Sequence, residues 1–274
     1  MLNQFLEEGL LGKSKTTIQT YANSLKLFSE WLDGAGASLE NYSRSDVQQY
    51  IDYLVSRRKN PSTINKHWSA IKKFSCWSDN ERAIEEIAVI KPIEYTKLSP
   101  KSLSRVEVNR LIREIDRENN SRDMAITQLL LNTGIRLSEL VSLDKRDIEI
   151  SERKGELFVR NGKGNKTRHI PLNKEARRAV NKYLCERNDN IEALFISNRG
   201  KRISVRSVQH IFEKKGVNVH ALRHTFITHL IRNGTDSSIV QSLSGHSSAE
   251  MLFRYSVPTE EDQLQALESI WLNQ

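Results

Sequence analysis

The stretch NTGIRLSEL, residues 132–140, places a single cation, Arg136, within a strongly apolar segment. Leucines at 129–131 precede it, and further apolar residues follow on both sides of Glu139. A buried guanidinium is costly unless an anion pairs with it. Glu139 lies three residues after Arg136 and would share its face of a helix. The stretch therefore predicts a buried Arg136–Glu139 pair, with either a structural or a functional role.

The sequence around this stretch predicts a mainly helical region with a small sheet. Apolar residues at three- and four-residue steps predict helices at 106–115, 124–131 and 135–143. Alternating, β-prone sequence then predicts three antiparallel strands at 147–150, 156–160 and 167–170, with Gly155 in the first connection. Beyond Asn173 the chain reads as helical, apart from a short run at 194–196.

The first ninety residues predict a separate four-helix domain. One helix spans 15–32, a second is capped by Ser45 and ends before Pro61, a third opens at Ser62, and a fourth covers 81–90. Pro92 and Pro100 mark the best linker. We therefore expect a helical domain at 1–90, a linker at 91–103 and a second domain at 104–274. The fold class is mainly α with a small antiparallel sheet (α+β).

Composition excludes several classes of protein. The chain has 274 residues, 38% of them apolar and 28% charged, which suggests two domains at roughly 150 residues each. No run reaches the roughly 18 apolar residues of a membrane span, and the N-terminus lacks the pattern of a secretory signal. Cys76 and Cys185 are the only cysteines, which excludes a disulfide framework. The sequence favours a reducing cytoplasm.

Net charge differs between the two parts of the chain. The first 99 residues carry 13 basic and 12 acidic side chains, whereas the rest carries 29 basic and 22 acidic ones, a net of +7. Such a surplus fits a polyanionic partner, most often nucleic acid, although a basic enzyme surface would also produce it.

Three familiar kinds of site lack support. Gly12-Lys13-Ser14 lacks the earlier glycine of a phosphate-binding loop. His220, His224 and His229 do not share one helix face, so neither zinc nor another metal is expected. A serine nucleophile has no Gly-x-Ser-x-Gly turn to present it.

A different set of side chains suits a phosphodiester. His220 and Arg223 lie three residues apart on one helix face, where an arginine can bind two phosphate oxygens and a histidine can move a proton. Lys163 lies in a glycine-rich hairpin, His246 follows Gly245, and Tyr255 comes nine residues later.

The chain order of these side chains is Arg136, Lys163, His220 with Arg223, His246 and Tyr255. In this order they resemble the site of the tyrosine recombinases, the integrase and Xer-type site-specific recombinases. The resemblance rests on TGIRLSEL (133–140), GKGNK (162–166), HALRH (220–224), GHS (245–247) and Tyr255, and it covers essentially the whole chain. The short length is closer to Xer proteins or transposon-encoded cointegrate resolvases than to phage integrases. Ser244 and Ser256-Val257 depart from the usual pattern, and neither position carries a catalytic group.

The resemblance implies a mechanism without metal, ATP or other cofactor. Tyr255 would attack a scissile phosphate to give a 3′-phosphotyrosyl link, while Arg136 and Arg223 hold the non-bridging oxygens. Lys163 would protonate the leaving 5′-oxygen, His220 would move a proton around Tyr255, and His246 would bind the phosphate. Glu139 would orient Arg136.

The resemblance also implies partners. Two domains would clamp duplex DNA, and several protomers would assemble on paired sites, in a tetrameric synapse. A terminal helix at 260–271, with Leu264, Leu267, Ile270 and Trp271, would dock on the neighbouring protomer, although its apolar stripe would equally suit its own domain. Phosphate contacts are expected from a basic cluster made of Arg57, Arg58, Lys59, Lys66, Lys72 and Lys73.

Two alternatives stay open on sequence alone. One is an accessory DNA-binding protein that retains the fold without catalysis. The other is a relaxase similar to type IB topoisomerases, which share the tyrosine chemistry.

Overall fold

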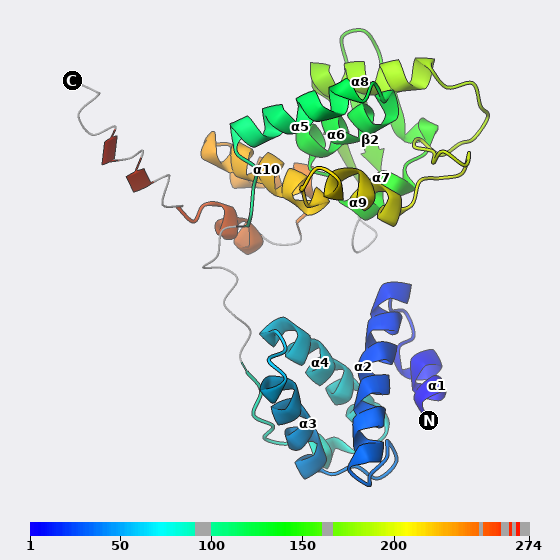
Figure 1. Cartoon of the computed structure of the whole chain (residues 1–274), viewed down its shortest axis with the longest axis vertical. Helices are drawn as coiled ribbons and strands as arrows, with labels where there is room; N and C mark the ends of the chain where they lie inside the picture. The colour runs from blue at the N-terminus through cyan, green and yellow to red at the C-terminus, as the bar shows by residue number, and fades with distance from the viewer. Residues whose placement is uncertain (91–99, 161–166, 247–248, 259–262, 265–266, 269–274) are drawn as a thin grey trace. The chain divides into compact units, whose positions relative to one another are not determined.

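The computed structural model describes the chain except residues 91–99, 161–166, 247–248, 259–262, 265–266 and 269–274. It divides into two compact units, Met1–Glu94 and Tyr95–Gln274. The first unit runs from blue to cyan in Figure 1, and the second from green to red. In the described part of the chain, no helix is long and apolar enough to cross a membrane.

The first unit is built from helices. In chain order it contains α1 (Leu2–Gln4), the π-helical turn η1 (Phe5–Gly9), α2 (Lys15–Gly34), α3 (Arg44–Ser56), α4 (Pro61–Trp77) and the 3₁₀ turn η2 (Glu81–Ile84). Side chains of Ser14, Ser43 and Asn60 cap the three long helices by accepting hydrogen bonds from backbone amides. The helix expected from Ser62 therefore begins one residue earlier, at Pro61, and the cap of α3 is Ser43 instead of Ser45.

The core of this unit is aromatic. Phe28, Tyr50 and Phe74 from the three long helices are fully buried. Phe5 of the N-terminal turn is buried with them, and its ring centroid lies 5.2 Å from that of Phe74 in an edge-to-face contact. The N-terminal helical segment, which the sequence analysis did not predict, is therefore part of the core.

The prediction of a fourth helix at 81–90 is wrong. Only Glu81–Ile84 forms a 3₁₀ turn, and the following residues are not helical. Side chains of the long helices bind the backbone of this segment instead: Arg44 donates to the carbonyls of Glu85 and Glu86, and Gln48 pairs with Ala88. These long-range hydrogen bonds replace the ones that a helix would have formed.

Among its described residues, the second unit consists of helical segments around a small sheet. The α-helices are α5 (Arg105–Arg117), α6 (Ser121–Thr133), α7 (Leu137–Ser142), α8 (Lys174–Cys185), α9 (Val205–Glu213), α10 (Val219–Arg232) and α11 (Ser237–Ser244), and η5 (Ala249–Tyr255) is a 3₁₀ helix. A short turn, η4 (Lys145–Asp147), precedes the sheet. Helix α6 lies at the centre and packs against α5, α8 and α10 (Figure 1).

The predicted three-stranded antiparallel sheet is confirmed. Its strands are β1 (Ile148–Ile150), β2 (Gly155–Val159) and β3 (Arg168–Pro171), in the order β1-β2-β3. Leu157 pairs with Ile148 on one side and Ile170 on the other, and all three side chains enter the core. Gly155 begins β2 and pairs with Ile150, so it does not lie in the connection. The fold is mainly helical with a small antiparallel sheet, as expected.

A residue at the start of the second unit forms a hydrogen bond with α10. Leu103 belongs to the core of this unit, and its backbone N–H donates to Thr225 Oγ1 at 2.8 Å. The expected linker at 91–103 thus includes at least one residue that packs inside the second unit. Residues 91–99 of that linker lie outside the described part of the chain.

Candidate active site

Arg136 is presented by a sharp turn between α6 and α7. Gly134 ends α6 in the left-handed conformation at φ +58°, and a Cβ added there would lie 2.3 Å from the Phe226 ring. Arg136 then precedes α7 and donates its backbone N–H to Glu139 at 2.7 Å. Its guanidinium donates to Glu139 Oε1 at 3.0 Å and to the Gly245 carbonyl at 2.7 Å. The predicted Arg136–Glu139 pair is therefore present.

Glu139 is buried and binds a second arginine that the sequence analysis missed. Its side chain is only 3% exposed, and Arg168 of β3 donates to both carboxylate oxygens, at 3.1 and 2.7 Å. Burial by itself would raise the pKa of Glu139, but hydrogen bonds and charge from Arg168 and Arg136 outweigh it and lower that pKa. Glu139 is therefore an anion that holds two cations in place.

Three arginines converge on the C-terminal end of α11. Arg168 donates to the Leu243 carbonyl at 3.0 Å, Arg223 to that of Ser244 at 2.8 Å, and Arg136 to that of Gly245. Carbonyls at a helix C-terminus carry partial negative charge, which favours neighbouring cations. This end of α11 therefore gathers side chains from three separate elements.

Arg223 is the more deeply buried of the two predicted phosphate-binding arginines. It is 8% exposed on α10 and also donates to the Gly134 carbonyl, which connects it to the turn that presents Arg136. Burial, followed by repulsion from Arg136, lowers the pKa of Arg223 to about 10. The guanidinium is still a cation at neutral pH.

Tyr255 ends η5 and is 4% exposed, within a small apolar cluster with Ile227, Val240 and Leu252. Its hydroxyl lies 2.9 Å from Nδ1 of His224 on α10. Burial raises the pKa of Tyr255, and the charges of the nearby arginines oppose that shift. The phenol is therefore protonated at neutral pH.

His246 is close both to the arginines and to Tyr255. Its Nδ1 is 2.8 Å from Ser244 Oγ, and its ring centroid is 6.1 Å from that of Tyr255. Burial, then the charges of Arg223 and Arg136, lowers the pKa of His246 to about 4, so the imidazole is neutral. The hydroxyl of Ser244, a departure from the usual pattern, here orients the His246 ring.

Among the described residues, His220 is not part of this contact network. His220 is exposed at the start of α10, and within the described residues its side chain has no hydrogen bond. The histidine in contact with Tyr255 is His224, one turn further along α10. From the sequence, His224 was considered only as a possible zinc ligand. Lys163 lies outside the described residues. Among those residues, no group of three or more histidine, cysteine or acidic side chains could hold a metal ion.

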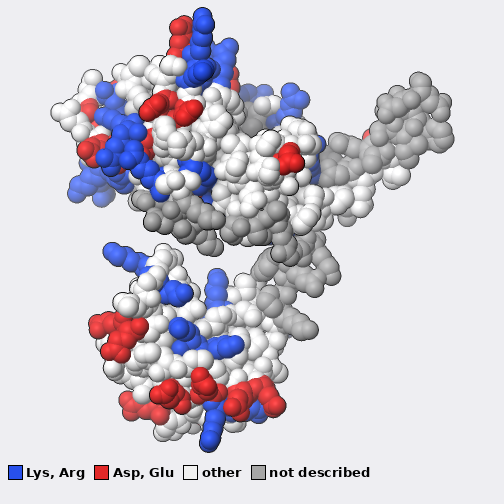
Figure 2. Space-filling model, turned by 180° about the vertical axis from the view of Figure 1, so that it is seen from behind, with Lys and Arg blue, Asp and Glu red and all other residues white. Residues whose placement is uncertain are grey.

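The predicted basic cluster lies on the surface of the first unit. All six of its residues are exposed, and within the described part of the chain none of them forms an ion pair. Arg57 packs over the Tyr53 ring at 5.8 Å from its centroid. In Figure 2, Lys and Arg side chains lie over the middle and upper part of the visible face of this unit and also at its bottom, and Asp and Glu side chains lie along its left and lower edges.

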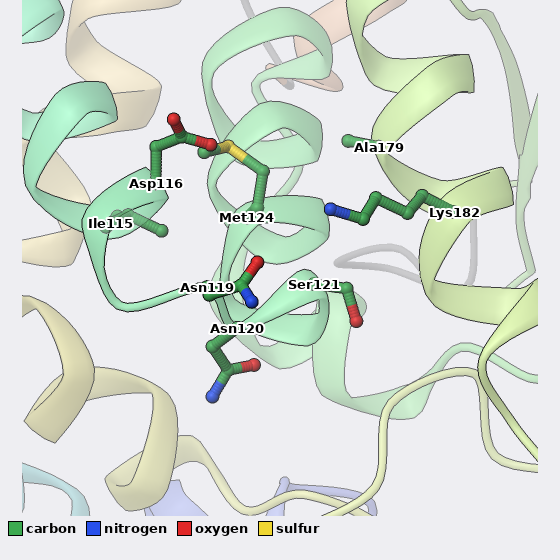
Figure 3. A pocket seen from close by; sticks show the side chains of 8 residues that line it. All are labelled: Ile115, Asp116, Asn119, Asn120, Ser121, Met124, Ala179 and Lys182. Atoms are coloured by element: carbon green, nitrogen blue, oxygen red, sulfur yellow. The ribbon is translucent and has the colours of Figure 1, made fainter.

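A small pocket in the second unit does not involve the active site. It lies between α5, α6 and α8, where Figure 3 shows Asp116, Met124 and Lys182 among the side chains that line it. No predicted site residue lines this pocket.

Comparison with known proteins covers both units. Residues 101–261 match the phage integrase family, and residues 2–81 match the N-terminal SAM-like domain of phage integrases. The chain is 32% identical to the tyrosine recombinase XerA of Thermococcus kodakarensis, over 97% of this chain and 95% of that protein. It is 29% identical to the TnP I resolvase of Bacillus thuringiensis, over 90% and 91% of the two chains.

Solved structures share the fold. The XerH site-specific recombinase bound to a palindromic difH substrate aligns with a TM-score of 0.75 at 22% identity, covering 93% of this chain and 80% of that one. A lambda integrase dimer bound to a core site aligns with a TM-score of 0.71 at 17% identity, covering 91% and 95%.

Proposed function

Since this chain belongs to the phage integrase family, a family of tyrosine recombinases, we propose that Tyr255 is the nucleophile of a site-specific DNA recombinase. The observation that carries the proposal is the convergence of Arg136, Arg223 and His246 at the C-terminal end of α11, with Tyr255 beside them. Attack by Tyr255 Oη on a scissile phosphate gives a 3′-phosphotyrosyl link and a free 5′-hydroxyl.

Arg136 and Arg223 neutralise the charge that develops on the phosphate. Their guanidinium groups are fixed by hydrogen bonds that are partly buried for Arg136 and buried for Arg223, so little reorganisation is needed at the moment of reaction. Both are cations that donate to backbone carbonyls, and a phosphate oxygen is a stronger acceptor for such donors. Glu139 acts through Arg136, which it orients.

The remaining roles follow from the hydrogen bonds and protons that each side chain can donate. His246 uses Nδ1 for Ser244, which leaves Nε2 for a phosphate oxygen. Lys163 would protonate the leaving 5′-oxygen. The covalent link conserves the energy of the phosphodiester, so neither metal, ATP nor another cofactor is required. A 5′-hydroxyl from a partner strand then attacks to complete the exchange.

We propose that the helical domain at 1–90 and the catalytic domain at 104–274 bind opposite sides of duplex DNA. The basic cluster supports this proposal because its six cations are exposed and without ion pairs among the described residues. Both cysteines are free and exposed, which fits a reducing cytoplasm, where we propose that the protein works.

Strand exchange between two sites needs several protomers, and we propose a tetramer on paired sites. The predicted terminal helix at 260–271 supports docking between protomers because Leu264 and Leu267 are 56% and 63% exposed. Its other two apolar residues, Ile270 and Trp271, lie outside the described part of the chain.

The test is covalent trapping on DNA. The protein is incubated in EDTA with nicked duplexes taken from the DNA that flanks its own gene, and the products are separated on a denaturing gel. We expect a covalent protein–DNA band from the wild type and none from Tyr255→Phe, which lacks only the nucleophilic oxygen.

Other outcomes would assign another function. Specific binding of DNA without a covalent band would indicate an accessory DNA-binding protein. Covalent trapping with relaxation of supercoiled DNA, but no exchange between two sites, would indicate a relaxase of the type IB topoisomerase kind.

A further inference from the structure

His224 has the contact with Tyr255 that the sequence analysis expected of His220. Nδ1 of His224 lies 2.9 Å from the tyrosine hydroxyl, and the two ring centroids are 5.7 Å apart. His246 also lies close, but its Nδ1 is engaged by Ser244. His220 has no hydrogen bond from its side chain among the described residues. Of these three histidines, His224 is the one in contact with the reacting oxygen.

The position of His224 suits a proton acceptor. It directly follows Arg223 on α10 and is half-buried, so its imidazole cannot turn freely into solvent. Burial, then repulsion from Arg223, His220 and Arg254, lowers the pKa of His224 to about 4. The imidazole is therefore neutral at physiological pH. Tyr255 is protonated, so its O–H can donate to the free lone pair on Nδ1.

We propose that His224 is a catalytic residue that takes the phenolic proton from Tyr255 when the tyrosine attacks the DNA. The proposal rests on the function proposed above. In the step, the Oη–P bond forms and the P–O5′ bond breaks. The proton of Oη moves to Nδ1 of His224, and O5′ takes a proton from Lys163. Religation returns both protons.

DNA binding itself prepares His224 for this step. Arg223 is next to His224 in the chain and is one of the arginines proposed to hold the phosphate. The negative charge of a bound phosphodiester offsets the cationic charge that disfavours an imidazolium here. A scissile phosphate in place therefore counters the repulsion that lowers the pKa of His224, while the contribution of burial stays.

The test measures the rate constant of single-turnover cleavage on a nicked duplex for His224→Asn and His224→Phe. Asparagine keeps an acceptor near the position of Nδ1 but cannot take the proton, whereas phenylalanine keeps the ring volume alone. His229→Asn is the matched control, because His229 is exposed on the same helix. DNA binding by each variant verifies that it is folded.

A second substrate separates the two proton transfers. In a duplex with a 5′-bridging phosphorothiolate, the leaving group is a thiolate that departs without a proton. We expect both His224 variants to cleave the ordinary duplex about 100-fold more slowly or worse, and to stay slow on the phosphorothiolate. A Lys163→Ala variant should be restored by that same substrate.

Any of the following results would overturn the proposal. A wild-type rate in His224→Asn would show that the contact only positions Tyr255. Restoration of His224→Asn by the phosphorothiolate would place His224 at the leaving group instead. If the wild type forms no covalent product on either substrate, the proposed function fails and this inference fails with it. A wild type that cleaves beside unaffected His224 variants would overturn the inference alone.

Discussion

The basic cluster of the first unit and the site arginines of the second unit differ in burial and in their partners. In the first, the core is aromatic and apolar, and the basic cluster lies on the surface without ion pairs among the described residues. In the second, Arg136, Arg168 and Arg223 are largely buried and are held by Glu139 and by backbone carbonyls. Exposed cations attract any polyanion and are screened by salt, whereas fixed cations can serve one phosphate at one position. In the function proposed above, the exposed cations would bind DNA and the fixed ones would hold the scissile phosphate.

The largest effect on stability is expected at the buried anion. Glu139→Gln removes the charge that holds Arg136 and Arg168, and we expect it to lower the free energy of opening of the second unit by about 3 to 5 kcal/mol. Amide hydrogen exchange in β2 and β3 measures this unit alone. Glu30→Gln is the control, since Glu30 belongs to an exposed pair with Lys26 on α2 of the first unit. Amide hydrogen exchange in α2 should show a loss of about 1 kcal/mol or less. Equal losses in the two variants would contradict the comparison.

The effect of the same substitution on the opening free energy should depend on pH. The pKa of Glu139 is lowered in the folded protein, so its stabilising contribution is complete above the ordinary value of 4.5. That contribution is lost as the pH falls through the lowered pKa. The difference in opening free energy between wild type and Glu139→Gln should therefore be constant near neutral pH and shrink below 4.5. A difference that grows on acidification would contradict the assigned ionisation.

A smaller effect is expected at the turn before Arg136. Gly134→Ala places a Cβ in the left-handed conformation and against the Phe226 ring, so we expect a loss of about 2 kcal/mol and slower cleavage. Gly216→Ala is the matched control, because Gly216 has φ +67° but no atom within 4 Å of the added Cβ. It should lose about 1 kcal/mol, from the backbone alone, with cleavage unchanged. Hydrogen exchange and covalent trapping measure the two quantities.

The smallest effect is expected in the basic cluster. Lys72→Gln and Lys73→Gln should each weaken DNA binding a few-fold and reduce the salt dependence of log Kd by about 0.9 for each phosphate that the variant no longer neutralises. The covalent step, measured at saturating protein, should be unchanged. Lys26→Gln, from the exposed pair with Glu30, is the control. If the salt dependence of log Kd is the same in all three variants, Lys72 and Lys73 do not contact DNA phosphates.

Local patterns in the sequence were enough to predict most elements of the fold. The long helices, the three strands and the Arg136–Glu139 pair follow from the spacing of apolar and polar residues over a few positions. The segment at 81–90 shows the limit of this reasoning. Its composition suits a helix, but Arg44 and Gln48, some 40 residues earlier, bind its backbone in a non-helical form.

The candidate site shows the same division. The residue types of the site and their order are readable along the chain, because a motif is a property of neighbouring residues. The contact of Arg168 with Glu139, 29 residues away, and the contact of His224, not His220, with Tyr255 across 31 residues depend on how the elements pack. Histidines at 220 and 224 share one helix face. Their difference arises because η5 packs against α10 and brings Tyr255 to one turn of that helix and not to the previous one.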